Sequence, residues 1–334
     1  IDIGSMLPHA ALRAYVMGER GANYKEDARP DEIAEMTRLT IEALEAGAIG
    51  VGTSRTVNHR SRTGAKIGTL TASNEELLGI AEGLRHTGKG VLQFVSDFKG
   101  LDDEMTLMRR AAEIAGRPLS VLLLQVHNAP DLWKDTLSRI HAARARGMDV
   151  TGQVGSRPIG VIFALEGSVH PFLTHPLFTA MDDLLPQARY AHLVSDADLR
   201  RRLWSERPDD AHTKWMADAM ARTFRLCEPL NYEPDPMESV AAHAAREGRD
   251  PFEVVLEWML EDGGKAMLLH TFENYFEGDL EIVRTMLEDP ATVCGLADAG
   301  AHVGLLCDAS SATSLITHWS RDRTRGPKLP LEFL

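Results

Sequence analysis

Residues 292–310 read TVCGLADAGAHVGLLCDAS, and this stretch decides our interpretation of the fold. Its first five residues form a short apolar run with β-branched side chains, which is typical of a buried strand. The run leads to Asp298, then to three small residues and His302. Barrel enzymes present catalytic groups in this way, in a loop that follows a buried strand. We therefore predict that Asp298 is a catalytic general base and that His302 contacts substrate. The alternative is that Asp298 caps the next helix and that His302 packs within the loop.

The rest of the chain alternates between predicted helices and strands in units of about 30 residues or more, which is typical of parallel βαβ construction. Apolar runs predict strands at residues 48–52, 91–95, 119–126, 150–154 and 266–270, with a further apolar run at 160–165. Amphipathic stretches predict helices at residues 30–46, 73–86, 104–115, 132–146, 251–260 and 279–287. The pattern indicates an α/β fold.

Most of the predicted strands end in polar side chains: Ser54-Arg55, Ser96-Asp97, Gln125 with His127, Gln153, and Asp298. An open doubly wound sheet would be expected to carry one glycine-rich phosphate loop, but the chain has no GxGxxG or Walker pattern. Polar groups at many strand ends instead favour an incomplete (β/α)8 barrel of the TIM type.

Residues 170–235 interrupt the alternation with a charged, largely helical stretch. We predict one barrel domain over residues 1–334, with an insertion at residues 170–235. The sequence begins at Ile1 rather than Met, and its last residues, LPLEFL, resemble the opening of a helix. We therefore expect the chain to be cut at both ends and the barrel domain to be partial.

Charge and cysteine content restrict the possible partners. The chain has 36 basic and 49 acidic residues and a net charge of −13, which argues against nucleic acid or an anionic membrane as a partner. No apolar run reaches the roughly 18 residues that a spanning helix needs. The three cysteines show neither CxxC spacing nor a disulfide framework, so we expect a reducing compartment, the cytoplasm.

Several side chains near predicted strand ends could bind substrate or metal. Arg55 and Arg157 could hold a substrate carboxylate through two parallel hydrogen bonds, although either could instead form a salt bridge within the protein. Ser54 and Tyr275 are further candidates for substrate binding. Histidine at a strand end is a plausible zinc ligand, and four histidines lie at such positions: His9, His127, His270 and His302. Because the chain has no HExxH or HxH pair, each could equally be an ordinary hydrogen-bonded residue.

Four segments, at residues 8–22, 42–61, 153–160 and 295–326, resemble the amidohydrolase-3 family, which includes the N-acyl-D-amino-acid deacylases (D-aminoacylase-like). The resemblance implies an amidohydrolase barrel beside a small β-sandwich, and hydrolysis of an acylated amine, usually with zinc. By position, Asp298 resembles the family's catalytic aspartate, which binds or activates the hydrolytic water, and His127 falls near a metal-ligand histidine. Asp298 is also a candidate metal ligand. Two departures stand out. Gln153 occupies a strand where a ligand histidine is expected, and the family's first-strand HxH and bridging cysteine would lie before Ile1.

These observations predict a metal-dependent hydrolase that cleaves the amide of an N-acyl D-amino acid, or of a related acylated amine, by attack of metal-activated water. Its partner would be a small-molecule substrate. One alternative is an amidohydrolase that acts on another C–N bond, such as a cyclic amide. The other is a barrel that binds a small ligand and has lost catalysis, because the strand that carries Gln153 lacks a ligand.

Overall fold

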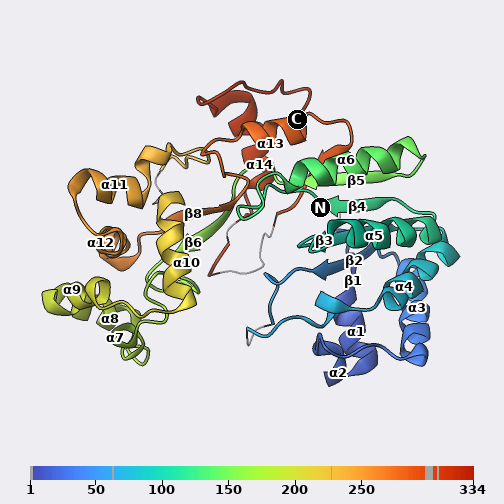
Figure 1. The fold of residues 1–334 in the computed structure, drawn as a ribbon, viewed down its shortest axis with the longest axis horizontal. Helices are drawn as coiled ribbons and strands as arrows, with labels where there is room; N and C mark the ends of the chain where they lie inside the picture. The colour runs from blue at the N-terminus through green and yellow to red at the C-terminus, as the bar shows by residue number, and fades with distance from the viewer. Residues whose placement is uncertain (1–2, 62–63, 227, 298–303, 307) are drawn as a thin grey trace. The chain divides into compact units, whose positions relative to one another are not determined.

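The computed structural model describes residues 3–61, 64–226, 228–297, 304–306 and 308–334. The chain divides into two compact units. The first contains residues 1–123, 132–154 and 289–293, and the second contains residues 124–131, 155–288 and 294–334. Mostly parallel strands alternate with helices along the chain, so the predicted α/β class is confirmed (Figure 1).

The first unit is built on a six-stranded sheet in the order β1-β2-β3-β4-β5-β9. Its strands are β1 (Leu7–Pro8), β2 (Gly50–Arg55), β3 (Val91–Ser96), β4 (Leu119–Leu122), β5 (Val150–Val154) and β9 (Thr292–Cys294). Neighbouring strands from β1 to β5 run parallel. The predicted strands at residues 48–52, 91–95 and 150–154 are therefore confirmed, and the crossovers between β1 and β5 are helical, as parallel pairing requires. The strand predicted at 119–126 ends at Leu122. The strand predicted at 292–296 ends at Cys294, and the prediction that it is buried is wrong, because Val293 is 51% exposed.

Four helices cover one face of this sheet and bury its core (Figure 1). They are α3 (Pro30–Glu45), α4 (Asn74–Thr87), α5 (Leu101–Ala115) and α6 (Leu132–Ala145). Alternate strand residues such as Val51 and Phe94 point into this core, because successive side chains of a strand face opposite sides. The other face carries polar groups, and the amide of Gln93 donates to the side-chain oxygen of Gln153 at 2.7 Å.

A buried polar network joins the ends of β1 and α1 (His9–Met17) to β2 and α4. The ring of His9 lies 2.8 Å from the hydroxyl of Thr53 and 2.7 Å from the carboxylate of Glu76. Arg13 donates to the other oxygen of Glu76. Burial alone would raise the pKa of Glu76, but these hydrogen bonds outweigh it and lower that pKa. A short helix α2 (Glu19–Ala22) and a 3-10 turn η1 (Gly68–Thr71) complete this region.

The second unit contains a three-stranded sheet in the order β6-β8-β7, formed by β6 (Ile159–Phe163), β8 (Leu268–Glu273) and β7 (Thr223–Arg225). Both pairs in this sheet are antiparallel. The prediction that residues 266–270 form a parallel strand of the barrel is therefore wrong in direction and in partner. An apolar run specifies burial but not strand direction, and β8 finds its partners in the apolar run 160–165 and in a strand that the charged stretch concealed.

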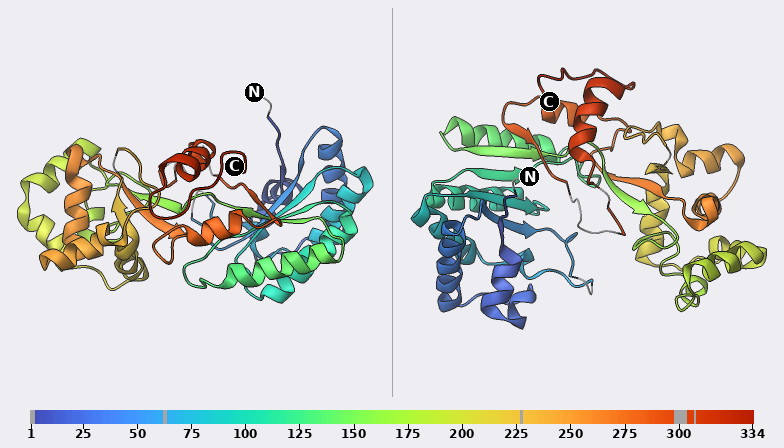
Figure 2. Two further views of the ribbon diagram at one scale, coloured as in Figure 1. Left: turned by 90° about the horizontal axis from the view of Figure 1, so that it is seen from above. Right: turned by 180° about the vertical axis from the view of Figure 1, so that it is seen from behind.

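Nine helical segments surround or follow this sheet within the described part of the second unit. They are α7 (Pro176–Thr179), α8 (Pro186–Ser195), α9 (Ala197–Ser205), α10 (Ala211–Ala219), α11 (Val240–Glu247), α12 (Pro251–Gly264), α13 (Glu281–Leu287), α14 (Ser311–Thr317) and η4 (His318–Asp322). Two 3-10 turns, η2 (Met220–Arg222) and η3 (Pro236–Glu238), lie between them. In both views of Figure 2 the helices between residues 176 and 264, coloured yellow-green to orange, gather at one end of the sheet.

The described residues of the expected insertion at 170–235 form α7 to α10, η2 and β7, joined by turns and loops, and they share their core with later residues. Phe178, Leu193 and Leu203 pack in one cluster with Val255 and Met259 of α12. The expected insertion is thus an integral part of the second unit's core. Among the described residues, no helix combines the length and the apolar character needed to cross a bilayer.

Candidate active site

The carboxyl ends of β2 and β3 lie at one edge of the first sheet, because these strands are parallel neighbours. This edge carries Ser54, Arg55 and Ser96, as the sequence predicted. The hydroxyl of Ser54 lies 2.6 Å from Nδ1 of His59, which follows in the next loop. Sequence analysis did not single out His59, because the chain holds no motif that pairs it with Ser54.

Arg55 is held by the protein itself. Its Nε lies 3.1 and 3.0 Å from the two oxygens of Glu104, and its Nη2 donates to Oε1 at 2.8 Å. Nη1 donates to the carbonyl oxygen of Ala72 at 2.8 Å, and Ser96 donates to Glu104 at 2.9 Å. Both members of the ion pair are largely buried. A substrate carboxylate would have to displace Glu104 to reach Arg55, so the structure favours a structural role, and substrate binding by Arg55 stays a prediction.

Arg157, the second predicted carboxylate-binding residue, is also paired. It forms an ion pair with Asp308 and donates to the hydroxyl of Ser310 at 3.2 Å. Its guanidinium lies over the ring of Tyr232, 4.7 Å from the centroid. Arg157 thus ties the start of the second unit to the segment before α14.

Tyr275 is buried, at 2% exposure, and its hydroxyl is fully engaged. It donates to the carbonyl oxygen of Pro234 at 2.6 Å and accepts from Arg325 at 2.9 Å. Burial raises the pKa of this phenol. These contacts join three separate segments of the second unit, so Tyr275 acts here as an anchor, and its predicted contact with substrate stays a prediction. Asp298 and His302 lie outside the described residues.

His127, the predicted metal ligand, contacts an arginine. Its Nε2 lies 2.6 Å from Nη1 of Arg222, at the end of η2. Arginine can only donate, so Nε2 of His127 accepts and the ring proton lies on Nδ1. Burial, and then the positive charge of Arg222, lower the pKa of His127. The imidazole also contacts Phe276, with 5.1 Å between ring centroids.

His270 lies in the middle of β8 beside this pair. It is fully buried, and its Nδ1 is 3.3 Å from the hydroxyl of Thr223, its register partner on β7. Nε2 is buried and has no hydrogen-bond partner among the residues that the structure describes. Burial, followed by the charge of Arg222, lowers its pKa to about 3, so the ring is neutral near pH 7. Phe163 stacks on it, with centroids 5.2 Å apart.

Comparison with known proteins gives these features a context. The model of the amidohydrolase family matches residues 1–334, the whole chain. The chain belongs to the amidohydrolase family. A search among curated proteins found no match.

Solved structures support the fold of this amidohydrolase. A D-aminoacylase mutant in complex with CuCl2 and a D-aminoacylase described for its binuclear metal centre each superimpose with a TM-score of 0.50 at 20% sequence identity. Each comparison covers 98% of this chain and 54% of the other, so the chain spans about half the length of these relatives. The likeness supports a TIM-barrel-type α/β fold; the six-stranded sheet described here is not closed on itself.

The metal centre that the resemblance implies is not formed by the described residues. Within them, no group of three or more His, Cys, Asp or Glu side chains is placed to hold a metal ion. Nε2 of His127 already accepts a hydrogen bond from Arg222, and the side-chain oxygen of Gln153 accepts one from the amide of Gln93. The predicted ligand Asp298 lies outside this part of the chain. The predicted zinc site therefore stays a prediction.

Arg222 is the functional candidate that sequence reasoning missed. It belongs to no recognisable motif and precedes a strand of only three residues. Its importance depends on the histidine that it contacts, which is 95 positions away in the sequence.

Proposed function

We propose that this amidohydrolase cleaves the amide of an N-acyl D-amino acid, or of a related acylated amine, with water and a bound metal. The observation that supports this proposal most is the family match over all 334 residues. The likeness of fold to D-aminoacylase is consistent with it. The overall reaction adds water across the amide and yields a carboxylic acid and a free amine.

We assign the proton transfers to Asp298. As a general base it takes a proton from the attacking water, and as a general acid it returns a proton to the departing nitrogen. The small residues 299–301 after it leave room for substrate. Because the described residues do not complete a metal site, we assign no step of the reaction to the metal.

The test is a substrate panel. Purified protein is incubated with N-acetyl derivatives of D- and L-amino acids, with acyl chains of several lengths, and the free amino acid is quantified by chiral chromatography. Metal content is measured on the same preparation. We expect release of amino acid from at least one D-series substrate in a metal-containing preparation. Cyclic amides form a second panel, and turnover there alone would support a different C–N specificity. Protein that takes up no metal from added zinc, binds these compounds and turns none of them over would overturn the proposal in favour of a binding protein.

A further inference from the structure

Arg222 carries a positive charge that no carboxylate neutralises within the described residues. Two arginines that are more shielded have acidic partners: Arg55 pairs with Glu104 and Arg323 with Glu233. Arg222 forms no ion pair there, and its hydrogen bond goes to the neutral ring of His127. Asp218 acts on it only as a nearby charge. A half-buried cation without a counter-ion is unfavourable unless an anion joins it.

The guanidinium also has unused hydrogen-bonding capacity. Its Nε is buried and has no acceptor, and no other arginine in the described part of the chain has such a buried, unpartnered nitrogen. A guanidinium offers five N–H donors in a planar fork that matches a carboxylate. One of these donors, on Nη1, is used in the hydrogen bond to Nε2 of His127. The side chain itself is partly exposed, so a small ligand can reach its outer nitrogens.

The surroundings favour an anion with an apolar part. His127 contacts Arg222, and His270 pairs in register with Thr223, the residue that follows Arg222; a histidine ring carries no negative charge whether or not it is protonated. Neither ring supplies a counter-charge. Phe276, which contacts His127, remains 44% exposed although it is a large apolar side chain. An exposed aromatic ring and an unpaired cation that both contact the same imidazole form the combination that an amphiphilic carboxylate would cover.

We propose that Arg222 binds the carboxylate of the substrate, with Phe276 beside the substrate's apolar group. His127 is then a positioning residue, because its Nε2 accepts from Nη1 and fixes the plane of the guanidinium. This assignment rests on the proposed function, since the carboxylate would be that of the N-acyl amino acid. It also replaces Arg55 and Arg157, whose guanidinium groups already have acidic partners.

Binding of two probes of equal size tests the site without any turnover. Hexanoate and hexanamide differ in charge but share the apolar chain, and calorimetric titration gives a dissociation constant for each. We expect the wild type to bind hexanoate more tightly than hexanamide. Charged hydrogen bonds of this kind contribute about 1.5–3 kcal/mol, so Arg222→Met should weaken hexanoate binding by roughly 10-fold to 100-fold and leave hexanamide unchanged.

Arg225→Met is the matched control. Arg225 lies three positions away and is an exposed arginine paired with Glu261, so its removal takes away one surface charge and should keep the preference for hexanoate. An Arg222→Met protein that folds and keeps that preference overturns the assignment. If Arg222→Met does not fold, Arg222→Lys decides in its place. Lysine keeps the charge but loses the planar fork, and an undiminished preference in that variant overturns the assignment equally.

Steady-state kinetics separate this inference from the proposed function. Hydrolysis of N-acyl D-amino acids with an unchanged KM in Arg222→Met would keep the function and overturn the role of Arg222. A selective loss of hexanoate binding in Arg222→Met, in a protein that hydrolyses none of the panel, would keep the carboxylate site and overturn the function.

Discussion

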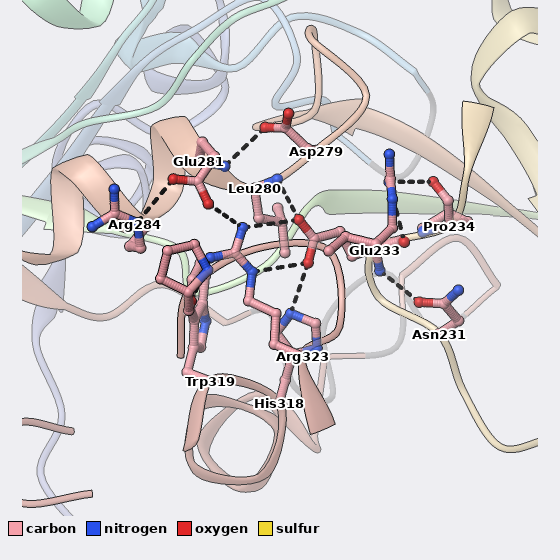
Figure 3. Close-up of polar contacts among 12 residues, drawn as sticks. Asn231, Glu233, Pro234, Asp279, Leu280, Glu281, Arg284, His318, Trp319 and Arg323 are labelled. Carbon is pink, nitrogen blue, oxygen red and sulfur yellow. Dashed lines mark hydrogen bonds and ion pairs between the residues drawn. The ribbon is translucent and has the colours of Figure 1, made fainter. Parts of the chain in front are cut away.

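Arg323 donates two hydrogen bonds to Glu233, from Nε to Oε2 and from Nη2 to Oε1, each 3.0 Å long (Figure 3). The two residues are 90 positions apart, and both are almost completely buried. Glu233 also accepts from the backbone N–H of Leu280 at 2.9 Å, and Nη2 of Arg323 reaches Glu281 at 2.7 Å. Burial alone would raise the pKa of Glu233, but hydrogen bonds from His318, Arg323 and Leu280 outweigh it and lower the pKa to about 2.

This pair should be a major contributor to the stability of the second unit. Arg323→Met leaves the Glu233 carboxylate buried with its main partner gone, so we expect a loss of about 3–5 kcal/mol in the free energy of unfolding. Arg321→Met is the control, because Arg321 and its partner Asp322 are exposed, and such a pair contributes about 0–1 kcal/mol. Urea unfolding followed by circular dichroism measures both. Equal, small losses in the two variants would contradict the assignment.

Acid should destabilise the protein partly through His170. This residue is 2% exposed, and its Nδ1 accepts from the backbone N–H of Phe172 at 3.2 Å. Burial, then the charges of His212 and Arg189, lower the pKa of His170 from 6.5 to about 4. Between these values the unfolded chain binds a proton that the folded protein does not. The contribution of His170 to the free energy of unfolding is therefore complete above about pH 6.5 and is lost as the pH falls to 4. This contribution is on the order of 3 kcal/mol.

The variant His170→Asn keeps an acceptor for the Phe172 N–H and removes the titrating ring. We expect its free energy of unfolding to fall less between pH 7 and pH 4 than that of the wild type, when both are measured in urea at several pH values. His192→Asn, at an exposed site on α8, should retain the wild-type slope. A His170→Asn slope equal to that of the wild type would exclude this source of acid sensitivity.

Strand β2 should tolerate an added methyl group at one of its glycines and not at the other. A Cβ at Gly50 would overlap the carbonyl oxygen of Val91 and lie 2.8 Å from its backbone nitrogen, on the neighbouring strand β3. At Gly52 the nearest atom would be the side-chain oxygen of Gln93, at 3.6 Å. We expect Gly50→Ala to cost about 1–3 kcal/mol, as overpacking does, and Gly52→Ala to be nearly neutral. Thermal unfolding measures the melting temperatures of the two variants, and we expect that of Gly50→Ala to be the lower. Equal melting temperatures would be inconsistent with the close approach of β2 and β3.

The sequence predicted the first unit well because local signals and tertiary structure agree there. The apolar run that ends near Ser54 is a strand, and at the start of the predicted helix 73–86 the hydroxyl of Ser73 accepts from the backbone N–H of Glu76. Parallel strands that alternate with helices leave few other arrangements, which is consistent with the pairing of β1 to β5 in chain order.

The second unit was harder to predict because its decisive contacts are long-range. The strand β7 lies in a charged stretch, and its residue Thr223 pairs with His270. The first unit has one such contact too: the partner of Arg55 is Glu104, 49 positions away, and no spacing rule relates the two. An arginine that follows a strand looks the same in sequence whether it meets a substrate or a glutamate. Burial and pairing of the side chain, which only the structure supplies, separate Arg222 from Arg55.

Kinetics and stability together should separate the two possible roles of Arg55. The bonds to Glu104 and to Ala72 O predict that Arg55→Lys lowers the free energy of unfolding by about 1 kcal/mol or more, because lysine cannot reproduce the forked contact. We expect the KM for N-acyl amino acids to stay near the wild-type value. A raised KM with unchanged stability would instead support the substrate-binding role predicted from sequence. Glu104→Gln is the companion variant, and it should produce a loss of stability similar to that of Arg55→Lys.

Asp298 is the residue on which the proposed chemistry depends most. In the sequence it precedes three small residues, and a carboxylate that acts as a base in an enclosed catalytic site needs a cation or strong donors to stay ionised near pH 7. Asp298→Asn keeps the shape and removes the base, so we expect kcat to fall by roughly 100-fold to 10,000-fold, the range typical of lost general acid–base catalysis. If Asp298 only capped the following helix, asparagine would serve nearly as well and turnover would barely change. The measurement is kcat for the best substrate of the panel, with metal content determined on the same samples so that loss of metal is not mistaken for loss of the base. Turnover near the wild-type value at equal metal content would show that Asp298 is structural, and the general base would then have to be sought elsewhere in the chain.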